Sequence, residues 1–294
     1  DRGLLTNYSF FDFATNGCKP ADMVLIAGES GFGKSLFLNN IAVQTWMQGN
    51  DLDTVEFKPG KNIIYFSLEM PYEDCFNRFI CKLAGVPSRA LENSKLTKEE
   101  FIKVKKALDF IKRYPYQFKI VDIVDASAND IEAILTEYQE EFDAVFVDYL
   151  GIMKTNEKND EADWLKQGVV SYELRAIARR HKIPMFSAVQ LNKKAAGKDS
   201  SDNIGLNRLA RSATIATHAT HVVQIENRAQ EEKYNDFLYH FIKNRKGPKG
   251  RGELTKNLAC ATLQDNNRAN TDAELNSYFI DQGDISEEME ELEL

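Results

Sequence analysis

The sequence predicts an α/β fold built on a mostly parallel, twisted sheet with helices on both faces. Short apolar runs alternate with longer helical stretches from residue 21 to residue 191. The runs are apolar throughout rather than at every second residue, which is typical of strands that are buried on both faces of a sheet. Together these two patterns favour parallel strands joined by crossover helices.

The expected strands and helices follow one another in regular order. The first apolar run, 21–27, is partly β-branched and leads through a glycine-rich segment into a helix. Further short apolar runs predict strands at 62–67, 117–121, 143–147, 184–189 and 221–226. Longer stretches of helical character predict helices at 34–48, 72–84, 98–113, 128–138, 163–181 and 208–219. Ser127 is the expected N-cap of the fourth of these helices.

Three segments are expected along the chain. Residues 1–20 are of mixed composition and are expected to be an entry segment with a linker remnant. Residues 21–264 form the expected α/β domain, which ends in an antiparallel hairpin around a turn rich in Gly and Pro. Residues 265–294 lack a core pattern and are expected to be a flexible, acidic tail. Because the chain begins at Asp1, we expect a longer protein on its N-terminal side.

The composition excludes several classes of protein. The net charge of −8 comes from residues 269–294, which hold nine acidic residues and no Lys or Arg. The rest of the chain is nearly neutral, so a nucleic-acid partner for it is not excluded. The spacing of the four Cys fits neither a disulfide framework nor a metal-binding motif. We therefore expect free thiols in a reducing compartment and no zinc site. The apolar runs are shorter than the roughly 18 residues of a membrane span, so no membrane partner is expected.

A phosphate-binding loop is the strongest chemical signal. Residues 28–35 match GxxxxGK[ST] in full, after an apolar strand and at the start of a helix. Backbone N–H groups of such a loop cradle phosphates, Lys34 would reach the β- and γ-phosphates, and the Ser35 hydroxyl would bind Mg²⁺. The predicted ATP-binding residues are Gly28, Glu29, Ser30, Gly31, Phe32, Gly33, Lys34 and Ser35.

Polar residues follow three further apolar runs. Asp148 ends one run, and in P-loop nucleotide hydrolases such an Asp holds Mg²⁺. Glu69 follows another run and would polarise the attacking water as general base, unless it is only a surface residue before the next helix. Gln190 would sense the γ-phosphate, or it is a solvent-facing amide. Carboxyl ends of parallel strands gather at one edge, so the three side chains are expected near the loop.

Two basic stretches lie later in the chain. The first, residues 192–211, predicts contacts with a nucleic-acid backbone. The contacting residues would be Lys193, Lys194, Lys198, Arg208 and Arg211. The alternative is that this stretch is only a solvated charged loop. In the other, Lys243 and Arg245 are two residues apart on a strand and share a face. This pair would reach a phosphate, either of nucleic acid or of a neighbour's nucleotide, or it protects an edge strand.

Several segments together resemble the motor domain of DnaB-type hexameric replicative helicases. The sequence variants found in these segments resemble those of phage proteins more than those of cellular ones. After the loop come residues 66–71 (FSLEMP), 147–153 (VDYLGIM) and 184–192 (PMFSAVQLN), in that order and spacing. Residues 212–225, 243–248 (KNRKGP) and 252–254 also match, so that the resemblance covers about residues 3–262. One departure is Ala210, where the family usually has Arg, which leaves open whether Arg208 or Arg211 contacts DNA.

The resemblance implies a RecA-like ATPase that assembles as a ring, expected to be a hexamer, around single-stranded DNA. Glu69 would be the catalytic carboxylate, Asp148 the Mg²⁺-linked acid and Gln190 the coupling residue. Lys243 and Arg245 would be a finger pair that enters the neighbouring subunit's nucleotide site. The implied cofactors are ATP and Mg²⁺, and the further implied partners are primase, a helicase loader, a polymerase or a single-strand-binding protein. The location would be the bacterial cytoplasm, the host's if a phage encodes the chain.

Two alternatives to an ATP-dependent helicase motor remain at this point. A strand-exchange ATPase shares the loop and the strand-end acids, but the Lys-x-Arg-x-Gly-Pro segment argues against it. An ATP-bound assembly or loading module, which binds a partner without unwinding DNA, is compatible with the acidic tail. Strand displacement on a forked duplex would discriminate between a motor and such a loader.

Overall fold

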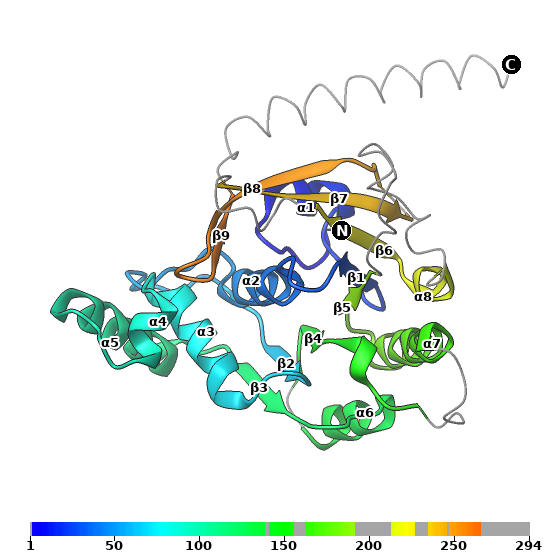
Figure 1. Ribbon diagram of the computed structural model, residues 1–294, viewed down its shortest axis with the longest axis horizontal. Helices are drawn as coiled ribbons and strands as arrows, with labels where there is room; N and C mark the ends of the chain where they lie inside the picture. Colours follow the sequence, from blue (N-terminus) through cyan, green and yellow to red (C-terminus); the bar gives the residue numbers. More distant parts are fainter. Residues whose placement is uncertain are drawn as a thin grey trace, which may run out of the picture.

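The computed structural model describes residues 2–138, 141–155, 163–191, 213–226, 235–245 and 247–265. These residues build one sheet in the order β3-β2-β4-β5-β1-β6-β7-β8-β9 (Figure 1). The strands are β1 Met23–Gly28, β2 Ile63–Ser67, β3 Phe118–Asp122, β4 Ala144–Asp148, β5 Met185–Gln190, β6 His221–Ile225, β7 Asp236–Asn244, β8 Arg251–Asn257 and β9 Thr262–Gln264. Strands β1 to β6 pair in parallel, and β7 to β9 continue the sheet antiparallel. The predicted parallel sheet with a late hairpin is confirmed.

Helices cover both faces of the sheet (Figure 1). They are α1 Ser9–Thr15, α2 Lys34–Met47, α3 Tyr72–Ala84, α4 Ser88–Glu92, α5 Lys98–Arg113, α6 Ala128–Glu137, the 3-10 helix η1 Leu150–Ile152, α7 Asp163–His181 and α8 Ala213–His218. One core cluster joins the sheet to α1, α2, α3 and α5, and includes Phe37 and Trp46. The other joins it to α6, α7 and α8, and includes Ile131 and Leu174. The sheet is therefore buried between two layers, as strands without alternation require.

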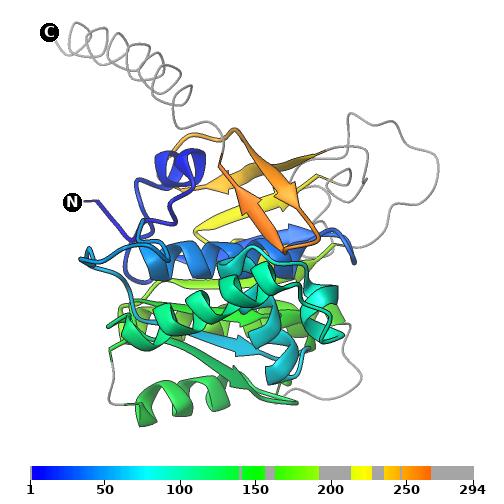
Figure 2. The ribbon, with the colours of Figure 1, turned by 90° about the vertical axis from the view of Figure 1, so that its left-hand side faces the viewer.

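The structure adds elements that the sequence pattern did not predict, namely α1, α4, η1 and β9. Helix α1 lies beside the β7–β8 ribbon, where it covers the antiparallel end of the sheet (Figure 2). Its seven residues are too few to show helical periodicity. Contacts distant in sequence fix the segment instead, including the Tyr8 hydroxyl, which donates to the Leu263 carbonyl (3.1 Å).

Local sequence signals account for the starts of two helices, α5 and α6. Ser127 caps α6 as predicted: its hydroxyl accepts from the Asp130 N–H (3.3 Å), and the Asp130 carboxylate accepts from the Ser127 N–H (2.8 Å). Thr97 and Glu100 form the same reciprocal arrangement at α5.

Strand β3 differs from the other parallel strands because it is only partly buried, as expected at the edge of the sheet. Among the helices that the structure describes, none has the length and apolar character needed to cross a bilayer.

Lys82 is a buried cation in the packing between α2 and α3. Its ammonium donates to Asn40 Oδ1 (2.5 Å), an atom that also accepts from the Leu263 N–H (2.9 Å). Burial lowers the pKa of Lys82 from its ordinary value of 10.5 to about 7. Between these two values the unfolded chain binds more protons than the folded chain, so Lys82 makes stability rise with pH.

We therefore expect Lys82→Met to flatten the pH dependence of stability. Between roughly pH 7.5 and 8.5 the free energy of unfolding of the native protein should rise relative to that of the variant by about 1 kcal/mol. Urea unfolding at both pH values measures this difference. Lys95→Met, at an exposed position, is the control and should keep the native slope. Equal slopes for the native protein and Lys82→Met would contradict the assignment.

Candidate active site

The phosphate-binding loop lies between the end of β1 at Gly28 and the start of α2 at Lys34. Gly31 and Gly33 have φ angles of 82° and 86°, a region that side chains with a Cβ rarely adopt. A Cβ on Gly33 would also lie 3.2 Å from the ring of Phe237. The glycines therefore allow the loop to turn tightly onto the amino terminus of α2, where free N–H groups are suited to bind an anion.

The Lys34 side chain folds back onto the loop and binds its backbone. Its ammonium donates to the Glu29 carbonyl (2.8 Å), which leaves further donors for phosphate oxygens. Burial lowers the pKa of Lys34, while the carboxylates of Asp148, Glu69 and Glu29 act in the opposite direction. The ammonium therefore lies among negative groups that favour its charged form.

Asp148 ends β4 directly beside the loop. Its carboxylate accepts from the Ser35 hydroxyl at Oδ1 (2.9 Å) and from the Tyr65 hydroxyl at Oδ2 (3.0 Å). Burial raises the pKa of Asp148, and the two hydrogen bonds oppose this shift. Ser35 and Asp148 present hard oxygen donors, which fit Mg²⁺ when phosphate oxygens complete its shell. No group of three or more His, Cys, Asp or Glu that could hold a metal occurs among the described residues.

Glu69 and Gln190 line the same cavity as the loop, which has a volume of about 680 Å³. Glu69 follows β2, and the Leu68 N–H donates to the Asp148 carbonyl (2.9 Å), so the ends of β2 and β4 are aligned. Gln190 ends β5 in register with Gly28. The expected gathering of these side chains beside the loop is thus present in the structure.

Three further residues of the cavity region were given no role by the sequence analysis. Tyr65 lies within an apolar run, and only its contact with Asp148 distinguishes it from a core aromatic residue. Arg78 of α3 lines the cavity, and its charge opposes the raised pKa of Asp148. Tyr149 lines the cavity from the segment after β4. Tyr149 belongs to the segment 147–153, whereas Tyr65 and Arg78 lie outside the motifs and are found only when the tertiary structure is known.

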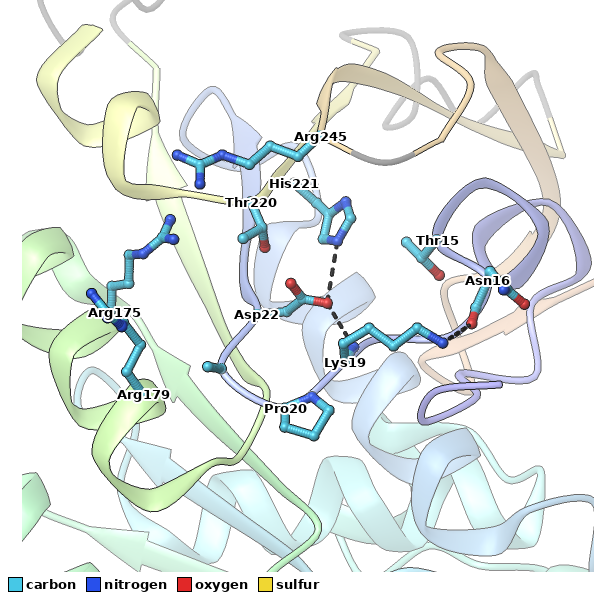
Figure 3. A pocket seen from close by; sticks show the side chains of 11 residues that line it. Thr15, Asn16, Lys19, Pro20, Asp22, Arg175, Arg179, Thr220, His221 and Arg245 are labelled. Atoms are coloured by element: carbon cyan, nitrogen blue, oxygen red, sulfur yellow. Dashed lines mark hydrogen bonds and ion pairs between the residues drawn. The ribbon is translucent and has the colours of Figure 1, made fainter. Parts of the chain in front are cut away.

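Lys243 and Arg245 lie on the side of the sheet where the parallel strands begin, opposite the side where these strands end at the loop. Strand β7 runs antiparallel to β6, so its last residue, Asn244, pairs with His221 at the beginning of β6. His221 pairs in turn with Val24, near the start of β1. Strand β1 has six residues, or about 20 Å, between this end and the loop. Figure 3 shows Arg245 facing a pocket that Arg175 and Arg179 of α7 also line.

Two sets of predictions lie outside the described residues. The predicted DNA contacts, Lys193, Lys194, Lys198, Arg208 and Arg211, belong to the first. The second is the acidic tail after Asp265.

Removal of the Tyr65 hydroxyl is expected to weaken metal binding. Its ring packs between Phe118 and Phe146, so Tyr65→Phe should fold normally, but Asp148 loses one of two hydrogen bonds. The loss of such a supporting hydrogen bond typically reduces metal affinity about 10- to 100-fold. Titration of ATP hydrolysis with Mg²⁺ should show a corresponding rise in the half-saturating concentration. Tyr149→Phe is the control, and an unchanged titration for Tyr65→Phe would contradict the role.

The chain matches one protein family over most of its length. The family model of the DnaB-like helicase C-terminal domain matches residues 3–265. Replicative DNA helicases DnaB of Mycoplasma genitalium and Haemophilus influenzae are 27% and 26% identical over 264 and 266 residues. These alignments cover 86% and 87% of this chain but 54% and 53% of the relatives, so the chain spans about half the length of the curated relatives it matches.

Two solved structures share the fold. A protein solved as an ATPase domain has a TM-score of 0.77 at 19% identity, over 90% of this chain and 91% of its own. A DnaB-like replicative helicase, described with its interactions with primase, has a TM-score of 0.77 at 19% identity, over 89% of this chain and 61% of its own.

Proposed function

The chain belongs to the DnaB-like helicase C-terminal domain family, and from this premise we propose that it is an ATP-driven DNA helicase motor. It would assemble as a ring, translocate on single-stranded DNA and unwind duplex by excluding one strand. Family membership favours this activity over the strand-exchange ATPase and over the loading module.

The observation that carries the proposal is the separation of two complementary half-sites. Lys34, Ser35, Glu69 and Gln190 line one cavity at the carboxyl ends of the parallel strands, and Asp148 accepts a hydrogen bond from the Ser35 hydroxyl beside it. Lys243 and Arg245 lie at the other end of the sheet, about 20 Å away. Such a pair cannot serve the cavity of its own subunit, but it can serve that of a neighbour in a ring.

Each residue has one task in the proposed reaction. The N–H groups of the loop and Lys34 bind and orient the phosphates, and Glu69 accepts a proton from the attacking water. Ser35 and Asp148 would hold Mg²⁺, which would neutralise part of the phosphate charge. Gln190 transmits the loss of the γ-phosphate to the segment after β5. Arg245, with Lys243, enters the neighbour's site and stabilises the charge of the transition state.

The partners follow from the proposed activity. They are single-stranded DNA and further copies of this chain, expected to be six. Because one structural neighbour is described with its interactions with primase, primase is proposed as a partner. A helicase loader, a polymerase and a single-strand-binding protein are further proposed partners. The place of action is the bacterial cytoplasm, that of the host if a phage encodes the chain.

The test measures ATP hydrolysis with and without single-stranded DNA, together with particle mass and strand displacement on a forked duplex. Strong stimulation by DNA, ring-sized particles and displacement would support the motor. ATP binding and ring formation without displacement would contradict it and favour a loading module. Since the chain spans about half the length of its relatives, the same assays on a longer chain show whether a further region is needed for the ring.

The predicted DNA contacts have their own test. Alanine at Lys193, Lys194, Lys198, Arg208 or Arg211 should lower affinity for single-stranded DNA and reduce its dependence on salt. Removal of one phosphate-binding cation should change the slope of log K against log[salt] by about 0.7. Binding isotherms at several salt concentrations measure both quantities, with Lys95→Ala as a control. An unchanged slope for all five variants would refute the assignment.

A further inference from the structure

The carboxyl end of α8 holds both members of the finger pair. The Lys243 ammonium donates to the carbonyls of Ala216 (2.6 Å) and Thr217 (3.2 Å). The Arg245 guanidinium donates to the same Thr217 carbonyl at 3.5 Å. These carbonyls belong to the last turn of the helix, where the helix dipole favours cations. The side chains of the finger pair are therefore held against the end of α8.

Helix α7 supplies a third cation to the same helix end. The Arg175 guanidinium donates to the His218 carbonyl at 2.6 Å, which is shorter than the contact of Arg245. One turn earlier in α7, the buried Ser171 hydroxyl donates to the Ile215 carbonyl (3.0 Å). Arg175 and Ser171 thus attach the last turn of α8 to the body of the domain.

The charges around this helix end repel one another. The pKa of Arg175 is lowered by burial and then by the charges of Arg245 and Arg179. The pKa of Lys243 is lowered by burial and then by Arg245 and Arg175. Figure 3 shows that Arg175 and Arg245 extend into the pocket from different elements. Arg175 and Arg245 therefore lie close together because they bind neighbouring carbonyls of α8, those of His218 and Thr217, and not because the side chains attract each other.

A carboxylate in the same pocket has other partners. Asp22 accepts from the Lys19 N–H (2.6 Å) and lies 3.5 Å from His221 Nε2 (Figure 3). Its charge acts on Arg175 more weakly than the neighbouring cations do. The arrangement is thus a set of cations on helix carbonyls rather than an ion-pair network.

We propose that Arg175 is a positioning residue of the finger pair: by fixing the last turn of α8, it sets where Lys243 and Arg245 meet the neighbouring subunit. This inference rests on the proposed function, because it assigns Arg175 a role only if the pair acts on a neighbour's nucleotide.

A merely structural role for Arg175 would give a different result from a positioning role. If it only stabilised α7 against α8, its loss would lower thermal stability and leave the finger of a folded subunit competent. If it positions the pair, its loss should impair hydrolysis in the neighbouring subunit. The experiment must therefore measure the finger of one subunit through the nucleotide site of another.

Mixed rings of the full chain provide this measurement. A Lys34→Ala subunit has an inactive site but an intact finger, and an Arg245→Ala subunit has the reverse. Each alone should be nearly inactive, whereas their mixture should recover DNA-stimulated hydrolysis. Absence of recovery would contradict the trans-acting pair, and with it the proposed function and this inference together.

The inference is tested by adding a second change to the Lys34→Ala subunit. With Arg175→Ala, the recovered rate should fall by a factor on the order of 10–100, because a misplaced group loses much of its catalytic effect. The KM for ATP should not change, since the active sites belong to the other subunits. Arg179→Ala, which removes a charge from the same pocket without a contact to α8 carbonyls among those described, should recover like Lys34→Ala alone.

Equal recovery with Arg175→Ala and Arg179→Ala would overturn the inference while leaving the trans-acting pair intact. Thermal unfolding of each subunit checks that the variants are folded. If Arg175→Ala does not fold, Arg175→Gln replaces it, because its shorter side chain cannot reach the His218 carbonyl in the same geometry. Reduced recovery with Gln supports the positioning role, and full recovery rejects it.

Discussion

Replacement of Arg245 by alanine is expected to reduce DNA-stimulated ATP hydrolysis by a factor on the order of 10³–10⁵. Arg245 follows the end of β7 that lies beside the start of β1, and the six residues of β1, about 20 Å of strand, separate this end from the loop of the same subunit, so nucleotide binding should remain nearly intact. The effect should appear in kcat, because transition-state charge is stabilised more than the ground state. Steady-state hydrolysis and equilibrium binding of an ATP analogue measure the two quantities separately.

Arg251→Ala is the matched control for this change. Arg251 is an exposed arginine at the start of β8, across the same turn, and its loss removes the same charge from the hairpin. It should leave hydrolysis close to the native rate. Equal turnover of native protein and Arg245→Ala would disprove the finger assignment, and a parallel loss of ATP binding would indicate a structural defect instead.

The part of the site that could be predicted from the sequence is the part that depends on local order. Gly28, Asp148 and Gln190 end buried parallel strands, and such strands bring their carboxyl ends to one edge whatever the crossovers between them. Once a phosphate-binding loop follows one of these strands, the polar residues that follow the others must lie nearby. The apolar runs themselves located β1, β2, β4, β5 and β6 because these strands are buried on both faces.

The rest of the site depends on contacts between segments distant in sequence. Tyr65 resembles any core aromatic residue until its hydroxyl is placed 3.0 Å from Asp148. Arg175 is one of several charged residues of α7, and only the position of α8 shows what it binds. Helix α1 and strand β9 are too short for periodicity to reveal them, and the Tyr8 contact with Leu263 joins the two segments. Three-dimensional packing decides these features, and no local pattern encodes them.

Glu69→Gln should produce the second large effect, a fall in kcat on the order of 10²–10⁴. The amide matches the carboxylate in shape but cannot accept a proton from water at neutral pH. Glu69 is exposed in the cavity, and the turn that carries it is held by the Ser67 hydroxyl, which donates to the Met70 carbonyl (2.6 Å). The substitution should therefore preserve the fold, ATP binding and ring assembly.

Glu92→Gln separates the loss of a base from the loss of a charge. Glu92 of α4 lines the same cavity, so its amide variant changes the net charge there equally. If Glu69 acts as the general base, only Glu69→Gln should abolish hydrolysis, and its rings should accumulate with ATP still bound. Similar, modest losses in both variants would show that the cavity requires negative charge but not a base at Glu69. Single-turnover hydrolysis of prebound ATP decides between these outcomes, because it measures the chemical step without product release.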